Sequence, residues 1–239
     1  MTTPLFREDA YLQETEATVT GINDDGGLSF DRTVFYPTGG GQPGDMGMLL
    51  HDGSETPIMT TVKGERPDEI IHILAEGATP PPVGTTVTLR LDWERRFRHM
   101  QVHTALHLLS VVIPLPVTGG SISAQKGRLD FDMPEAPEDK DALEAQLNAL
   151  IKGDHPVSTE WITDEELAAK PEMVKTMSVK PPSGQGRVRL VRIGTGDATV
   201  DLQPCGGTHV ARTGEIGPVK LGKVEKKGKQ NRRVSVLLP

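Results

Sequence analysis

Short apolar or alternating runs dominate the N-terminal part of the chain. They are EATVTGI (16–22), LSFDRTVFY (28–36), MGMLLHD (46–52), EIIHILAE (69–76) and TVTLRLD (86–92). Turn-forming stretches such as NDDGG and GATPPPVGT separate these runs. A period of two between turn residues is typical of β-strands. Because the strands follow one another closely without long helices, we expect a small β-barrel domain over residues 1–90.

The pattern changes to a mixture of helices and strands over residues 91–239. Apolar positions from Phe97 to Leu109 recur at helical spacing, Asp92 is a candidate N-cap, and Pro114 ends the run. Further helices are predicted in PEDKDALEAQLNALIKGD (137–154) and TDEELAAK (163–170), strands in RLDFDM (128–133), PVSTEWI (156–162), RVRLVRIG (187–194) and ATVDLQ (198–203), and a closing hairpin over 217–239. The sequence therefore predicts an α+β protein whose second domain packs helices on a mostly antiparallel sheet.

Composition narrows the class of protein only slightly. Of the 239 residues, 36% are hydrophobic and 25% charged, as in an ordinary globular protein. No apolar run approaches the roughly 20 residues of a membrane span, and the N-terminus lacks a signal-peptide pattern. Cys205 is the only cysteine, which excludes an internal disulfide and favours a reducing compartment. We expect a cytoplasmic protein without a membrane partner, and no stable protein partner is implied.

Positive charge is concentrated in two places on an otherwise acidic chain. The net charge of −7 argues against a protein whose whole surface binds nucleic acid. Residues 220–233 nevertheless contain five lysines and two arginines, and Arg95, Arg96 and Arg98 form a second basic group. These groups are either a solvated hairpin and helix start, or two ends of a phosphate-contacting surface.

Two histidines stand four positions apart on the long predicted helix. His103 and His107 would share one helical face, with side chains close enough to bind one zinc ion. Such a pair alone is weak support for a metal site, because histidines on half-buried helix faces are common. The residues between them are Thr, Ala and Leu, so the glutamate of the HExxH metalloprotease motif is missing.

A second pair, Cys205 and His209, repeats the same offset in the segment CGGTH. A lone cysteine is usually a small buried hydrophobe, but this one lies four residues from a histidine. Three imidazoles and a thiolate from two segments suit zinc better than calcium or magnesium, so we expect one Zn²⁺ per chain. The site is either closed by four ligands or catalytic with three, and His209, which follows the GGT stretch, is then the candidate for the loose ligand.

Three consecutive glycines follow a predicted strand in FYPTGGGQPGD (35–45). The stretch is either a flexible turn or a loop whose backbone N–H groups bind an anion or a carbonyl oxygen. No Lys-Ser/Thr follows, which excludes a nucleotide P-loop. Thr38 and Gln42 flank Gly39, Gly40 and Gly41 with a hydroxyl and an amide.

These motifs together resemble a known family. YPTGGGQPGD, DWERRFRHMQ with HTALH, CGGTH and KGKQNRRV resemble, in this order, the editing domain of alanyl-tRNA synthetases. They are more similar to the free-standing AlaX-type alanyl-tRNA editing proteins, because no class II synthetase core precedes them in these 239 residues. Threonyl-tRNA synthetases have a related editing domain with the same histidine and cysteine spacing, which makes them the nearest rival.

The resemblance implies a small β-barrel domain followed by an α/β editing domain, with the site at their junction. It implies a zinc-dependent deacylase of mischarged tRNA(Ala), with Ser-tRNA(Ala) as the chief substrate and Gly-tRNA(Ala) as a second candidate. Rival hypotheses are a deacylase of Ser-tRNA(Thr), a non-catalytic zinc-stabilised RNA-binding module and a metallohydrolase of small esters.

The resemblance also assigns roles to individual residues. His103, His107, Cys205 and His209 correspond to zinc ligands, and Thr38 and Gln42 to catalytic residues, although the position of Thr38 varies in the family. The substrate-binding set comprises Gly39, Gly40, Gly41, Asp45, Arg96, Lys227, Arg232 and Arg233. The partner is mischarged tRNA, which we expect the basic residues to contact through its backbone rather than by stacking, because aromatic residues make up only 4% of the chain.

Overall fold

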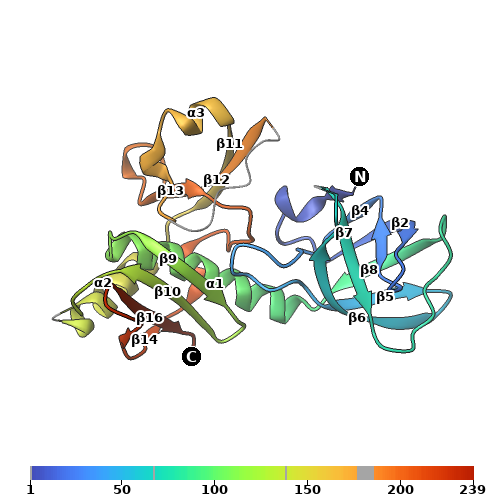
Figure 1. Cartoon of the computed structure of the whole chain (residues 1–239), viewed down its shortest axis with the longest axis horizontal. Coiled ribbons are helices and arrows are strands. Elements are labelled where there is room, and N and C mark those ends of the chain that lie inside the picture. Colours follow the sequence, from blue (N-terminus) through green and yellow to red (C-terminus); the bar gives the residue numbers. More distant parts are fainter. Residues whose placement is uncertain (1, 67, 138, 177–185) are drawn as a thin grey trace. The chain divides into compact units, whose positions relative to one another are not determined.

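A computed structural model describes residues 2–66, 68–137, 139–176 and 186–239 (Figure 1). The chain is α+β with mostly antiparallel sheets, as predicted, and it divides into two compact units, Met1–Phe97 and Arg98–Pro239. The sequence-based boundary near residue 91 remains a prediction. Among the described residues, no helix is long and apolar enough to cross a membrane.

Six antiparallel strands of the first unit close into a barrel (Figure 1). Their order around it is β2 (Glu14–Ile22), β3 (Leu28–Phe30), β7 (Ile70–Leu74), β6 (Ser54–Lys63), β5 (Gly47–His51) and β8 (Thr86–Leu91), which pairs back with β2. A short parallel pair, β1 (Thr3–Pro4) and β4 (Arg32–Thr33), lies outside the barrel, and η1 (Leu5–Arg7) follows β1. Closure leaves no unpaired sheet edge.

Alternate residues of the strands fill the barrel. In β8, Val87, Leu89 and Leu91 point inward and pack with Phe30 and Phe35. Strand β6 was not among the expected strands because SETPIMTTVK is mostly polar and contains a proline. It nevertheless pairs with both β5 and β7 and buries Ile58 and Thr61, on either side of a register shift, so barrel closure overrides a weak local pattern.

A fully buried ion pair lies in the first unit. The guanidinium of Arg96 donates to the Asp45 carboxylate, to the Ala10 carbonyl at 3.1 Å and to the Val34 carbonyl at 2.7 Å. The same carboxylate accepts the Tyr36 N–H at 2.6 Å. The expected surface position of Arg96 therefore needs correction: its side chain is 0% exposed and fixes the segment from Tyr36 to Asp45.

We expect Asp45→Asn to lower the free energy of unfolding by about 3–5 kcal/mol, because Arg96 would be left buried without its counter-charge. Urea denaturation followed by circular dichroism measures the change. Arg66→Gln is the control, since it breaks the exposed ion pair with Glu69 and should have a much smaller effect. Equal effects of the two substitutions would contradict a structural role for the buried pair.

The long helix α1 (Trp93–Val112) starts where the sequence predicts. The Asp92 carboxylate accepts the Arg95 N–H at 3.1 Å, which confirms Asp92 as the cap. In the second unit the helix packs closely on a sheet. A Cβ added to Gly127 would lie 2.5 Å from Val102 Cγ1, so only glycine leaves room for this contact.

The sheet beneath α1 has the order β14 (Lys220–Leu221), β16 (Asn231–Leu237), β10 (Lys126–Asp132) and β9 (Val117–Ile122) (Figure 1). Strand β15 (Glu225–Lys226) also pairs with β16, which confirms the predicted closing hairpin. Strand β9 was not predicted, because VTGGSI contains two glycines. Helix α2 (Lys140–Lys152) follows its cap Asp139.

A separate antiparallel sheet consists of β11 (Val157–Thr163), β12 (Arg187–Ile193) and β13 (Asp201–Pro204). One of its faces packs Val188 and Leu190 against Leu167 of α3 (Asp164–Ala168), whose predicted capping box is present. Strand register places Trp161 beside Arg189 and Gln203 beside Val191 on the opposite face. The short 3-10 turns η2 (Pro171–Met173), η3 (Gly196–Ala198) and η4 (Thr213–Ile216) complete the unit.

Candidate functional site

Four potential metal ligands meet in the second unit. His103 and His107 project from one face of α1, and Cys205 and His209 lie on the loop after β13. Their ligand atoms all lie within 4.8 Å of one another. Cys205 Sγ is 3.5 Å from His103 Nε2 and 3.3 Å from His209 Nε2. The fold thus brings together the two pairs that the sequence analysis singled out.

The separation of these donor atoms suits a tetrahedral metal ion. Zn–N bonds of about 2.0–2.1 Å and a Zn–S bond of about 2.3 Å put neighbouring donors about 3.3–3.6 Å apart. The two sulfur-to-nitrogen distances lie in this range. The three imidazoles are buried and the thiol is half-buried. Such a cluster of soft and borderline donors is the composition expected of a structural or catalytic metal site.

A buried carboxylate orients His107. Asp201 Oδ2 lies 3.1 Å from His107 Nδ1, while Asp201 Oδ1 accepts from Lys175 Nζ at 2.6 Å. Gln203 Nε2 donates to the same carboxylate at 2.7 Å. A carboxylate on the far ring nitrogen is the usual support of a metal-binding histidine, because it fixes the ring and leaves Nε2 toward the ligand cluster.

A threonine orients His209 in the same way. Thr104 Oγ1 donates its one proton to the Met100 carbonyl at 2.9 Å, so it accepts from its two other neighbours. These are Val210 N at 3.3 Å and His209 Nδ1 at 3.1 Å. The network therefore assigns the proton of His209 to Nδ1 and the free lone pair to Nε2, which points to Cys205. The His209 ring is therefore held by Thr104, although two glycines precede it in the chain.

The pKa values of Cys205, His107 and His209 are shifted by burial and by their neighbours in the cluster. Burial alone would raise the pKa of the Cys205 thiol, but the His103 and His209 imidazoles outweigh it and hold the pKa well below its ordinary value. Burial and the neighbouring His103 lower the pKa of His209 to about 3. Burial opposes protonation of His107, yet the Asp201 and Cys205 contacts raise its pKa to about 9. Thiolate and neutral His209 are the forms that bind metal.

An arginine secures the loop that carries Cys205. Arg189 Nη1 donates to the carbonyls of Cys205 and Gly207, each at 2.9 Å, and the Cys205 N–H returns to the Arg189 carbonyl at 3.1 Å. Sequence reasoning missed Thr104, Asp201 and Arg189. For Arg189 and Asp201 the signal in the sequence was a charged residue within the strands β12 and β13.

The glycine-rich segment of the first unit is a tight turn. Gly39 and Gln42 exchange two backbone hydrogen bonds of 3.0 Å, and the residues between them, Gly40 and Gly41, have φ of 57° and 83°. Positive φ at both central positions defines a type I′ hairpin turn, which favours glycine. Two of the three glycines are thus explained by backbone geometry, and substrate contact by this turn remains a prediction.

The side chains on either side of the turn differ in exposure. Thr38 is exposed, and its hydroxyl donates to the Thr61 carbonyl at 3.2 Å and accepts the Gly44 N–H at 2.9 Å. Gln42 is buried. The Thr38 hydroxyl therefore links the loop after the turn to strand β6.

Most residues of the predicted RNA-contacting hairpin have acidic or carbonyl partners. Arg233 makes two hydrogen bonds of 2.7 and 2.8 Å to Asp130, and Lys227 pairs with Glu225 at 2.8 Å. Arg232 donates to the carbonyls of Pro134 and Asn231. These contacts stabilise the hairpin, and an RNA-binding role for it stays a prediction.

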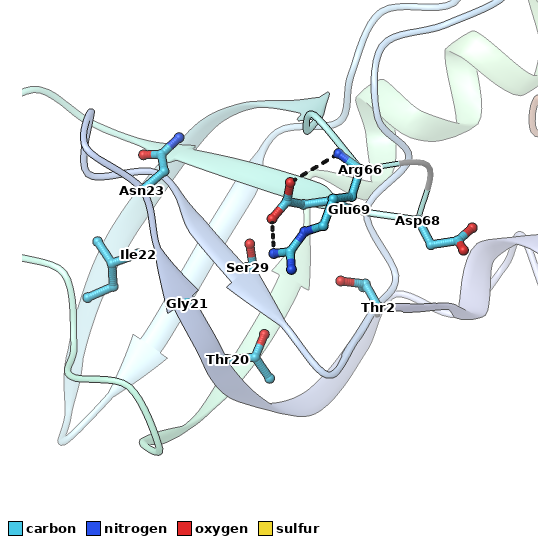
Figure 2. A pocket seen from close by; sticks show the side chains of 9 residues that line it. All are labelled: Thr2, Thr20, Gly21, Ile22, Asn23, Ser29, Arg66, Asp68 and Glu69. Atoms are coloured by element: carbon cyan, nitrogen blue, oxygen red, sulfur yellow. Dashed lines mark hydrogen bonds and ion pairs between the residues drawn. The ribbon is translucent and has the colours of Figure 1, made fainter.

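A cavity of about 610 Å³ lies in the barrel unit, and none of the residues that line it belongs to the predicted site. Figure 2 shows the Arg66–Glu69 ion pair on its wall, with Asn23 and Thr20 among the other lining residues. Two of its three charged side chains, Arg66 and Glu69, pair with each other, and its described lining contains neither histidine nor cysteine.

Comparison with known proteins defines the class. The family model described as "Threonyl and Alanyl tRNA synthetase second additional domain" matches residues 188–235, and that of "tRNA synthetases class II (A)" matches residues 7–95. The alanyl-tRNA editing protein AlaX-M of Methanosarcina acetivorans is 36% identical, over 98% of both chains. That of Methanosarcina mazei is 35% identical, over 98% of this chain and 95% of the relative.

Larger proteins contain a similar region. The alanine–tRNA ligase of Pyrobaculum neutrophilum is 35% identical over 94% of this chain, which corresponds to 25% of the ligase. The fold, the ligand cluster and these matches define an aminoacyl-tRNA editing protein. The chain belongs to the AlaX-M family of alanyl-tRNA editing proteins.

We expect Asp201→Asn to weaken metal binding by about 10- to 100-fold, because His107 would lose the carboxylate that fixes its ring. Titration of the purified protein with a metal ion in competition with a chromogenic chelator measures this affinity. Asp197→Asn is the matched control, since Asp197 is exposed and lies outside the cluster. If both variants bind metal like the parent protein, Asp201 does not support the site.

Proposed function

We propose that the protein is a zinc-dependent deacylase that removes serine from mischarged tRNA(Ala), with Gly-tRNA(Ala) as its second substrate candidate. The observation that carries the proposal is the convergence of His103, His107, Cys205 and His209. Membership of the AlaX-M family supports tRNA as the substrate. The donor set supports zinc as the ion, because a thiolate with three imidazoles suits it.

Residues in and around the cluster have two roles: some would bind the ion, and others hold the binding side chains in position. His103, His107, Cys205 and His209 would bind it, and Asp201 and Thr104 keep two of the rings in the ligating orientation. Zinc, when bound, supplies a Lewis acid next to the acyl ester. Arg189 keeps the Cys205 loop in place by binding its carbonyls. An aminoacyl ester is already activated, so hydrolysis demands less of the site than peptide cleavage does.

The amino acid preference has a physical basis. A synthetase pocket cannot strongly reject a slightly smaller or more polar analogue of its substrate, so a second site is needed. A site that hydrogen-bonds the serine hydroxyl rejects alanine, because alanine would leave buried polar groups unpaired. We propose Thr38 and Gln42 as the groups that read the hydroxyl, with Gly39, Gly40 and Gly41 and their supporting Asp45 giving the loop its shape.

We expect the protein to deacylate Ser-tRNA(Ala), and chelation of the metal to abolish this activity until Zn²⁺ is restored. Incubation with Ser-tRNA(Ala), Gly-tRNA(Ala), Ser-tRNA(Thr) and Ala-tRNA(Ala), each labelled in the amino acid, measures the release. Full activity of demonstrably metal-free protein would contradict the zinc dependence. Preference for Ser-tRNA(Thr) would instead favour the threonyl specificity.

The same experiment separates the other rivals. A non-catalytic RNA-binding module would bind tRNA without releasing any amino acid, and it would unfold on chelation. A hydrolase of small esters would act independently of RNA and of salt concentration, whereas contacts with RNA phosphates weaken steeply as salt rises. Cys205→Ser serves as the matched variant, because it removes the thiolate and changes little in volume.

We expect Thr38→Val to lower the ratio of serine to alanine release by about tenfold or more, because one polar partner of the serine hydroxyl disappears. The ratio of the two kcat/KM values is the readout, since loosening of the loop near Gly44 would lower both together. Thr20→Val, an exposed substitution elsewhere on the barrel, is the control. An unchanged ratio would remove Thr38 from the specificity mechanism.

A further inference from the structure

Trp161 is the one aromatic residue among the large hydrophobic side chains that are exposed in the described part of the chain. It lies on β11 and is 41% exposed. The guanidinium of Arg187 stands 4.5 Å from the centre of its ring. Most large apolar side chains of the unit are buried, so an exposed indole capped by a cation is unusual for its surroundings.

Strand register connects this pair to the ligand cluster. Trp161 lies opposite Arg189, so both side chains are on the same face of the sheet. Arg189 in turn binds the carbonyls of Cys205 and Gly207. The Cys205 N–H, directly after β13, donates to the Arg189 carbonyl, so Trp161, Arg189 and Cys205 form a row about 10 Å long at the usual strand spacing.

The charged residues on the Trp161 face of the β11–β12–β13 sheet indicate what it could bind. Arg187 is exposed on this face beside Trp161, whereas Arg189 is buried and occupied by the Cys205 and Gly207 carbonyls. Asp201, on the same face by register, is buried and accepts from Lys175. Glu160, the acidic residue of β11, pairs in register with Leu190 and belongs to the opposite face. The opposite face packs against α3 through Leu190 and Val188. The exposed part of this face therefore offers a flat aromatic ring and the guanidinium of Arg187 together, as proteins that bind single-stranded nucleic acid do.

We propose that Trp161 and Arg187 form a stacking platform for a base at the single-stranded 3′ end of tRNA, next to the ligand cluster. The inference rests on the proposed function and deepens it. The terminal base is joined to the aminoacyl ester by one ribose, so a ligand held at the cluster carries its base a short way along the same face. Stacking does not read the base sequence, which suits an end common to all tRNAs.

The first test measures binding without hydrolysis. The chain contains two tryptophans, and Trp93→Phe leaves Trp161 as the only one. Trp93 packs with Tyr11 and Phe97 in the first unit. We expect the RNA tetranucleotide ACCA to quench the remaining fluorescence saturably, and the same oligonucleotide with an abasic 3′ residue to bind several-fold more weakly. Equal binding of the two, or no quenching, would overturn the platform.

The second test measures the KM and kcat of Ser-tRNA(Ala) deacylation separately. We expect Trp161→Ala to raise KM about tenfold and to leave kcat nearly unchanged, Trp161→Phe to retain most of the affinity, and Arg187→Gln to have an intermediate effect. A purely structural cross-strand pair would instead lower the urea midpoint of Trp161→Ala and leave KM unchanged, which would overturn the proposal.

The two tests also keep the inference and the proposed function distinguishable. If the parent protein deacylates no mischarged tRNA, the proposed function fails while the oligonucleotide titration still decides the platform. If the parent protein is active and Trp161→Ala has the parent KM, the platform fails and the deacylase function stands.

Discussion

The close approach of one thiolate to three imidazoles constrains how the segments of the second unit pack together. Cys205 and His103 are separated by 102 residues, yet Sγ and Nε2 lie 3.5 Å apart. Groups of this kind are costly to bury without a partner, and a metal ion would supply that partner for all four at once. The cluster therefore joins the loop after β13 to helix α1.

Polar residues next to the cluster fix the orientation of its imidazole rings and the position of the Cys205 loop. Asp201, Thr104 and Arg189 are all buried, and each contacts a ligand or the backbone next to one. Buried polar groups require hydrogen-bond partners, so the same contacts that satisfy them also restrict the rings and the loop. A site held in this way does not depend on the rigidity of the CGGTH backbone, which glycine alone would leave free.

The sequence predicted what depends on neighbouring residues and missed what depends on distant ones. The Asp92 cap, the Thr163 capping box and the His103–His107 face are set within one helical turn, and all three are present. Strand β6 was missed because its pairing comes from barrel closure. Arg96 resembled a surface cation, and only its pairing with Asp45, 51 positions away, shows that it is interior.

The partners of the basic residues also affect how an acidic protein would bind RNA. Arg233 and Lys227 of the closing hairpin are already paired with Asp130 and Glu225, so binding a phosphate there would exchange one partner for another. Such an exchange gains less free energy than a contact by a solvated cation. Binding would then depend more on the few contacts close to the reacting ester. An exposed aromatic ring with an arginine over it contributes through stacking, which salt weakens less than it weakens phosphate contacts.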